Sequence, residues 1–187
     1  MFCVSFYVEY INIMKSFIDW IVLKEAGYYT LEPQDKIASG TEAEVFNTSD
    51  PDIVVRVQRK KKKSRCEKIL SRPSIQATGG VVAIHGSKNV EGIEYTYKEK
   101  VNLNWEKFLQ TVYPMHDANE IIEKLLSLKD LDFPRDQEEF DNIKKFLRHV
   151  PETTNLVSAI EAGVPIVDLY AHNMGVNRDN KIIIIDC

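Results

Sequence analysis

The sequence predicts an α+β protein in two parts, a β-rich part followed by a helical part that ends in a hairpin. Short apolar runs bounded by turn residues dominate positions 36–101, a pattern typical of strands. From position 117 onward, apolar residues recur every three or four positions, which is typical of amphipathic helices. A last pair of apolar runs around a polar turn, at 173–186, favours a hairpin.

The composition is that of a globular chain without an extreme charge. Of its 187 residues, 44% are hydrophobic and 28% are charged, and the net charge is −4. No overall field therefore attracts nucleic acid or a membrane surface. The cysteines, at Cys3, Cys66 and Cys187, are odd in number and widely spaced, which favours neither a zinc site nor a disulfide framework. We expect a cytoplasmic protein.

Residues 1–30 are expected to form an N-terminal helical extension. Apolar residues from Tyr7 to Ile21 recur at helical spacing, and charged residues such as Glu9 and Asp19 interrupt them. Those charges exclude a membrane span, and the lack of a basic start excludes a signal peptide. An amphipathic helix packed on the core is the simpler interpretation, and docking to a partner or a second copy is the alternative.

Residues 31–101 are expected to form the β-rich part. The segment "KIASGTEAEVFN" predicts a strand, a glycine turn and a strand, and "PDIVVRVQ" predicts a third strand. The segment "GGVVAIHGSKNVEGIEYTYKEKV" predicts two more strands around a Lys-Asn turn. Between them, the basic run Arg59–Arg65 leads into a short helix. The run is interpreted as a solvated loop, with a docking patch for an acidic partner or a nucleic acid backbone as the alternative. Because no aromatic residues are interleaved with it, we do not expect a nucleic-acid partner.

Residues 102–187 are expected to form the helical part. Three segments have the apolar periodicity of helices, at residues 117–128, 136–150 and 153–163. Asp136 and Glu139 have the spacing of a capping box at the start of the second helix. Gly163 is expected to end the third helix.

Three polar side chains in the last twenty residues could serve a metal–nucleotide site. Asn173 follows Asp168 by five positions, and Asp186 follows a run of four isoleucines. In phosphoryl transfer, an aspartate can orient the attacking hydroxyl. An amide oxygen and a second carboxylate are the hard oxygen ligands that magnesium prefers. The isoleucine run predicts a stiff, buried strand that holds Asp186 in place.

These residues resemble the protein-kinase-like superfamily. The segment "DLYAHN" matches the catalytic-loop pattern D-L-x-x-x-N, and "IIIID" matches the strand that ends in the metal-binding aspartate. The resemblance covers about residues 36–187, and in layout it is similar to the short bacteriophage-encoded serine/threonine kinases. It implies a minimal two-lobed fold with an antiparallel β N-lobe and a truncated helical C-lobe that carries the catalytic hairpin.

The resemblance also implies a cradle for ATP. The segment "ASGTEAEV" is similar to the family's glycine-rich loop, so Gly40, Thr41 and Val45 are the implied nucleotide contacts. Ala38 and Ala43 stand where the family has glycines.

Four further residues are implied in nucleotide binding by the same resemblance. Arg56 stands in the place of the family's phosphate-binding lysine, and Glu67 is its implied ion-pair partner. A guanidinium is larger and flatter than an ammonium, so the contact geometry should differ. The segment "YKEKV", with Glu99 and Val101, is similar to the hinge that binds adenine through its backbone.

The function implied by the resemblance is that of a minimal ATP- and Mg²⁺-dependent protein serine/threonine kinase, encoded by a phage and acting on host proteins. Asp168 and Asn173 would be catalytic, and Asn173 and Asp186 would hold the metal. Tyr170 replaces the family's basic residue in this loop, and His172 is a candidate to approach the phosphate. No membrane partner is expected, and the oligomeric state is left open.

Two alternatives stay open. A pseudokinase that binds and inhibits a host factor is favoured by the altered glycine loop, by Arg56 and by the short helical part. A small-molecule phosphotransferase is favoured by Val167, because those enzymes also lack an arginine before the catalytic aspartate.

Overall fold

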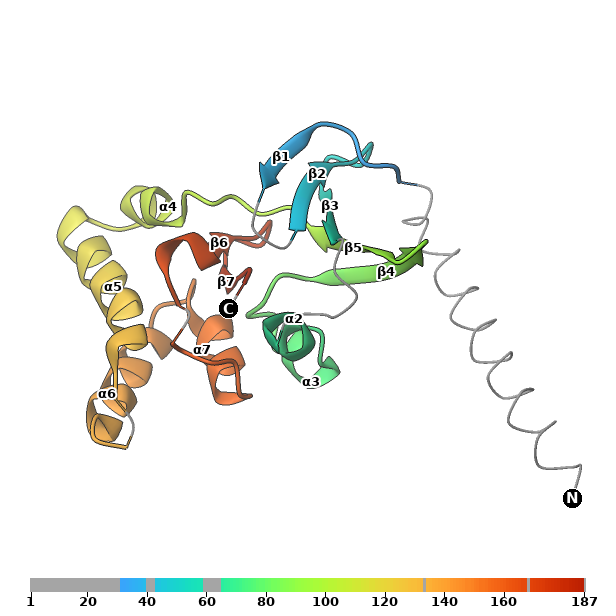
Figure 1. The fold of residues 1–187 in the computed structure, drawn as a ribbon. Coiled ribbons are helices and arrows are strands. Elements are labelled where there is room, and N and C mark those ends of the chain that lie inside the picture. Colours follow the sequence, from blue (N-terminus) through green and yellow to red (C-terminus); the bar gives the residue numbers. More distant parts are fainter. Residues whose placement is uncertain (1–30, 40–42, 59–64, 133, 168, 187) are drawn as a thin grey trace, which may run out of the picture. The chain divides into compact units, whose positions relative to one another are not determined.

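Two units make up the part of the chain that the structure describes. The structure is a computed structural model, and it describes residues 31–39, 43–58, 65–132, 134–167 and 169–186 (Figure 1). One unit takes its residues from positions 1–61 and 85–98, and the other from positions 62–84 and 99–187. The expected N-terminal helix, Gly40, Thr41, Asp168 and all of the basic run except Arg65 lie outside the described residues.

The first unit is built on a five-stranded antiparallel sheet in the order β1-β2-β3-β5-β4. The strands are β1 (Lys36–Ser39), β2 (Ala43–Asn47), β3 (Ile53–Gln58), β4 (Ile84–Val90) and β5 (Ile93–Glu99). Its small core is formed by Ile53, Val55 and Tyr97. Ile53 and Val55 are two positions apart and so lie on the same face of β3. The α+β class and the five expected strands are therefore confirmed.

The turn of the β4–β5 hairpin differs from the predicted one. We expected it at the Lys-Asn pair, but Lys88 and Asn89 belong to β4. The turn is formed by Glu91 (φ +52°) and Gly92 (φ +81°). Two successive left-handed residues are what a two-residue hairpin turn requires, because this twist matches that of the flanking strands. The Asn89 side chain supports the turn by accepting a hydrogen bond from the backbone N–H of Gly92 (3.1 Å).

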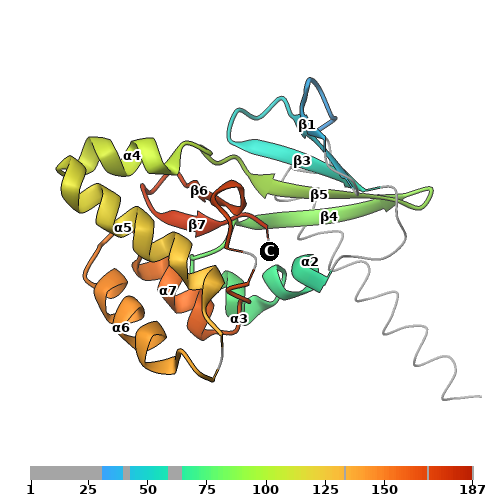
Figure 2. The ribbon, with the colours of Figure 1, turned by 60° about the vertical axis from the view of Figure 1, so that its left-hand side comes forward.

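The second unit contains the helices and a two-stranded sheet (Figure 1). Its elements are α2 (Arg65–Leu70), α3 (Pro73–Gln76), α4 (Trp105–Val112), α5 (Met115–Ser127), η2 (Leu128–Asp130), α6 (Gln137–Arg148), α7 (Thr154–Glu161), η3 (Ala171–Asn173), β6 (Met174–Val176) and β7 (Ile182–Ile184). Helices α4 to α7 pack against one another in chain order, and α7 also contacts β7 (Figure 2). The buried apolar residues of this unit form one core that extends from α2 to β7.

The three expected helices are confirmed, but the capping box is not. Asp136 precedes α6 as predicted, yet its carboxylate accepts a hydrogen bond from the backbone N–H of Asp132 (2.7 Å). Among the described residues it caps no N–H group of α6. The carboxylate closes the turn that precedes the helix and is thereby drawn away from the helix. Gly163 ends α7 with φ +105°, as expected.

None of the helices that the structure describes combines the length and the apolar character that a membrane-spanning helix needs.

Candidate functional site

The predicted hairpin at the end of the chain is confirmed. β6 and β7 pair antiparallel, with Met174 opposite Ile184 and Val176 opposite Ile182. The β7 side chains, Ile182 to Ile184, are fully buried, as the isoleucine run predicts. The strands of the hairpin are therefore anchored in the core of the second unit, and the open end, where the chain enters β6 and leaves β7, lies at the border of that core.

Asn173 and Asp186 lie at this open end. Asn173 directly precedes β6, and its carbonyl oxygen accepts a hydrogen bond from the backbone N–H of Ile185 (2.8 Å). Asp186 is the next residue after Ile185. One ladder hydrogen bond thus fixes the backbone of the amide-bearing residue beside that of the carboxylate-bearing residue. The Asp186 side chain is exposed and the Asn173 side chain is half-buried.

β7 is held on its second edge by a segment from much earlier in the chain. The backbone N–H of Ile184 donates to the Gly80 carbonyl (3.0 Å), and its carbonyl accepts from the N–H of Val82 (2.8 Å). At the other end of the strand, the N–H of Ile182 donates to the Glu152 carbonyl (2.7 Å). These bonds pair three backbone groups on the outer edge of β7 that would otherwise be buried without a partner.

Gly80 is required where this segment meets α7. A Cβ atom at this position would lie 2.0 Å from the backbone oxygen of Asn155 and 2.5 Å from its carbonyl carbon. Only a glycine permits this approach, and sequence reasoning did not single it out. The "GG" pair before an apolar run was the available signal, since a glycine beside a strand often marks a close backbone contact.

β6 is held by the segment that was predicted to be the adenine-binding hinge. Asn102 and Val176 exchange two backbone hydrogen bonds, of 2.8 and 2.9 Å. A Cβ atom at Gly175 would lie 3.0 Å from the Val101 side chain and 3.2 Å from the Asn102 carbonyl oxygen. The backbone of Glu99 is fixed just before this contact, because its N–H donates to the Ala83 carbonyl (2.9 Å). The hairpin and the predicted hinge thus share a backbone contact.

The loop before Asn173 is fixed by a tryptophan. The indole Nε1 of Trp105 donates to the Ala171 carbonyl oxygen (2.9 Å), and the Trp105 side chain is almost fully buried. Leu169 is also fully buried, and the N–H of Asn173 donates to the Tyr170 carbonyl (2.9 Å). Trp105 is therefore part of the core and also orients the loop.

A tyrosine that follows α4 and a glutamate that precedes α7 support the same hairpin. The Tyr113 hydroxyl donates to the Glu152 carboxylate, while the Glu152 backbone carbonyl holds Ile182. Burial, followed by the hydrogen bond to Glu152, raises the pKa of Tyr113 to about 12. The contact links the end of α4 to β7.

The remaining predicted site residues divide between the units. Val45 and Arg56 lie in the first unit, directly opposite each other on β2 and β3. The Arg56 guanidinium donates to the Gln58 side chain (2.7 Å) on the same strand. Glu67 lies in α2 of the second unit and is buried. The structure therefore brings together Val45 with Arg56, and separately Asn173 with Asp186, while Val101 lies against Gly175 of the same hairpin.

The hairpin residues offer oxygen ligands for a metal. Within the described ranges, no three or more His, Cys, Asp or Glu side chains gather at metal-binding distance. Asn173 and Asp186 would instead provide one amide oxygen and one carboxylate. Magnesium is commonly bound by one or two carboxylates and completed by phosphate and water oxygens. This donor set thus suits a metal ion that arrives with a nucleotide.

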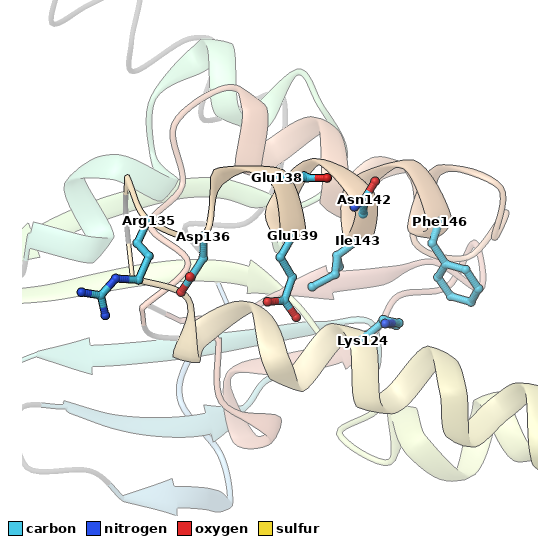
Figure 3. A pocket seen from close by; sticks show the side chains of 8 residues that line it. All are labelled: Lys124, Arg135, Asp136, Glu138, Glu139, Asn142, Ile143 and Phe146. Atoms are coloured by element: carbon cyan, nitrogen blue, oxygen red, sulfur yellow. The ribbon is translucent and has the colours of Figure 1, made fainter.

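A pocket of about 550 Å³ lies elsewhere in the second unit, between α5 and α6 (Figure 3). Its lining mixes both signs of charge, with Lys124 and Arg135 near three carboxylates. Figure 3 shows Glu139 and Ile143 pointing from α6 toward α5. None of its lining residues is a predicted site residue.

Neither a protein-family model nor a curated protein sequence matches this chain. Its function is therefore inferred from the residues and their geometry.

Proposed function

We propose that this protein is a minimal ATP- and Mg²⁺-dependent protein serine/threonine kinase. The observation that carries the proposal is the hydrogen bond between Ile185 and Asn173 at the open end of the β6–β7 hairpin (2.8 Å). Through it, a side-chain amide and the Asp186 carboxylate emerge from adjacent backbone positions. The resemblance to bacteriophage-encoded kinases suggests host proteins as the substrates.

In this proposal, Asn173 and Asp186 hold the metal through their side-chain oxygens. The metal, when bound, neutralises negative charge on the nucleotide phosphates. Asp168 orients the hydroxyl of a substrate serine or threonine and accepts its proton as the hydroxyl oxygen attacks. The γ-phosphoryl group passes to that oxygen, and ADP leaves.

The resemblance implies which residues would hold the nucleotide. Arg56 supplies positive charge for the phosphates, and Glu67 is its proposed partner. The backbone of Glu99 and Val101 would bind the adenine ring, a role supported by their fixed position next to the hairpin. Gly40, Thr41 and Val45 would cover the phosphates.

The surroundings of the hairpin support a catalytic role. Catalysis of phosphoryl transfer depends on positioning and on charges fixed before the reaction begins. Here β7 is fully buried and is hydrogen-bonded on both edges. The residues that would hold the metal are thus attached to one of the most completely packed elements of the second unit.

The test is transfer of labelled phosphate from ATP in the presence of Mg²⁺. We expect the wild-type protein to label itself or proteins of a host lysate. Asp168→Ala and Asp186→Asn should each reduce the rate by about 100-fold or more, because they remove groups that act on the reacting atoms. Asp179→Asn, in the exposed turn of the same hairpin, is the matched control and should keep wild-type activity. If the wild-type protein labels no protein, it is not a kinase for the substrates tested.

A pseudokinase that binds a host factor is the second candidate. The observation that favours it is Arg56, which replaces lysine and donates a hydrogen bond along its own strand to Gln58. The absence of both nucleotide-dependent thermal stabilisation and label transfer would favour this function. Nucleotide-dependent stabilisation together with label transfer would identify the kinase.

A further inference from the structure

A lysine from a distant part of the chain lies against the loop that precedes Asn173. Residues 168–173, "DLYAHN", contain no lysine or arginine. The ammonium nitrogen of Lys129, however, lies 5.6 Å from the centroid of the Tyr170 ring. Lys129 belongs to η2, the short helix that follows α5. A cation at this distance over an aromatic face is attracted by the electron density of the ring.

The loop directs two side chains toward solvent at this place. Ala171 is fixed through its carbonyl by Trp105, and the side chains on either side of it, Tyr170 and His172, are both exposed. Their rings stack, with centroids 5.5 Å apart and planes 11° from parallel. Tyr170 therefore contacts a cation and an imidazole at once.

The ammonium of Lys129 forms an ion pair with a carboxylate that a phosphate group can replace. It binds both carboxylate oxygens of the neighbouring Asp130, at 2.6 and 2.7 Å. The Lys129 side chain is only 24% exposed, whereas that of Asp130 is 70% exposed. An ion pair with such an exposed carboxylate contributes little stability. Phosphate oxygens accept the same kind of charge-assisted hydrogen bond and can take its place.

We propose that Lys129, Tyr170 and His172 form an anion-binding group for a phosphate of the bound nucleotide. This inference rests on the proposed function and deepens it, because it names the source of positive charge at a loop that has none of its own. Lys129 supplies the charge, Tyr170 positions it, and an imidazole N–H of His172 donates a further hydrogen bond in either protonation state. Fixed donors of this kind stabilise the charge on a transferring phosphoryl group.

Inorganic tripolyphosphate is the probe that tests this group without a reaction. Its affinity for the full chain is measured by calorimetry in the wild type and in three variants. Lys129→Gln should weaken binding about tenfold, the loss expected for one charge-assisted hydrogen bond. Asp130→Asn should strengthen binding, because it removes the competing carboxylate. Lys107→Gln makes the same charge change at an exposed position of α4 and should leave the affinity unchanged.

Labelling with ATP, run in parallel, separates this inference from the proposed function. Equal tripolyphosphate affinity of the wild type and Lys129→Gln, or no binding by the wild type, would overturn the anion-binding group. If label is still transferred in that case, the proposed kinase function is not contradicted. Weaker binding by Lys129→Gln combined with no label transfer by the wild type would support the group and reject the kinase. Lys129→Arg keeps the charge and should keep most of the affinity, which excludes loss of folding as the cause.

Discussion

The two hairpins of this protein are stabilised in different ways. β4 and β5 are seven residues each, and their turn is closed by Glu91 and Gly92. β6 and β7 are three residues each, and all six residues are buried. A hairpin with so few hydrogen bonds of its own is not stable alone. The short hairpin therefore depends on contacts with segments 80–82, 101–102 and 152, whereas the long one is continued through β3 as part of a regular five-stranded sheet.

This difference shows which part of the molecule determines the positions of the candidate site residues. Asn173 and Asp186 are attached to the hairpin that is held from outside, so their positions are determined by the core of the second unit. Mutations at the outside contacts should therefore affect the site without touching it. Mutations in the exposed turn of the long hairpin should affect stability only locally and mildly.

The largest expected effect is that of Gly80→Ala. The added methyl group would meet the backbone of Asn155 at 2.0 Å, and a backbone carbonyl cannot turn aside as a side chain can. We expect a loss of about 3 kcal/mol or more in the free energy of unfolding, measured by urea denaturation. Gly92→Ala in the long hairpin is the matched control. It meets no atom within 4 Å and should cost only about 1 kcal/mol for its left-handed backbone. An equal loss in both variants would contradict the comparison.

Trp105→Phe should have the next largest effect. It removes the indole N–H that binds the Ala171 carbonyl and leaves a space in the core. The expected loss is about 2 kcal/mol in the free energy of unfolding. Because the loop is no longer fixed, tripolyphosphate affinity should fall as well. Unchanged affinity in the folded variant would show that the loop is held without the tryptophan.

The Tyr113 contact predicts a smaller, pH-dependent effect. The folded protein keeps the phenol protonated, with a pKa of about 12. An unfolded tyrosine has a pKa of about 10. The stabilising contribution is therefore fully present below about pH 10 and is lost as the pH rises through about 12. Between these values, the wild type should lose more stability than Tyr113→Phe, as followed by denaturation at each pH. Parallel curves for the two proteins would exclude the contact.

Glu91→Asn should change the stability least, and it should raise the free energy of unfolding instead of lowering it. Glu91 has φ +52°, a conformation that asparagine adopts more readily than glutamate. The resulting Asn-Gly pair is the preferred sequence for this turn. A gain of about 0.5 kcal/mol in the free energy of unfolding is expected, with no change in nucleotide binding. A large loss of stability would mean that the long hairpin also depends on outside contacts through its turn.

Local patterns in the sequence predicted the elements better than their contacts. The isoleucine run predicted β7, and Gly163 predicted the end of α7, since both signals are local. The β4–β5 turn was misplaced because Lys88-Asn89 and Glu91-Gly92 are both plausible turns. Asp136 has the spacing of a capping residue, but its carboxylate serves the turn before the helix.

The contacts that hold the candidate site in place could not be predicted from the sequence. Helix α4 was missed, because its eight residues are fewer than the window of about 11 to 18 over which helical periodicity is read. With it, the contact between Trp105 and Ala171 was missed. The closeness of Gly80 to Asn155, and of Lys129 to Tyr170, arises from packing between segments far apart in the chain. Asn173 and Asp186 could be paired in advance only because one hairpin joins them.

The most direct test of the metal site is the effect of Mg²⁺ on ATP affinity in the wild type and in Asp186→Asn, measured by calorimetry. The substitution keeps the size of the side chain and removes the carboxylate charge. If Asn173 and Asp186 share a magnesium ion with the nucleotide, Mg²⁺ will strengthen ATP binding by the wild type and will not strengthen binding by the variant. The same Mg²⁺ dependence in both proteins would contradict the account.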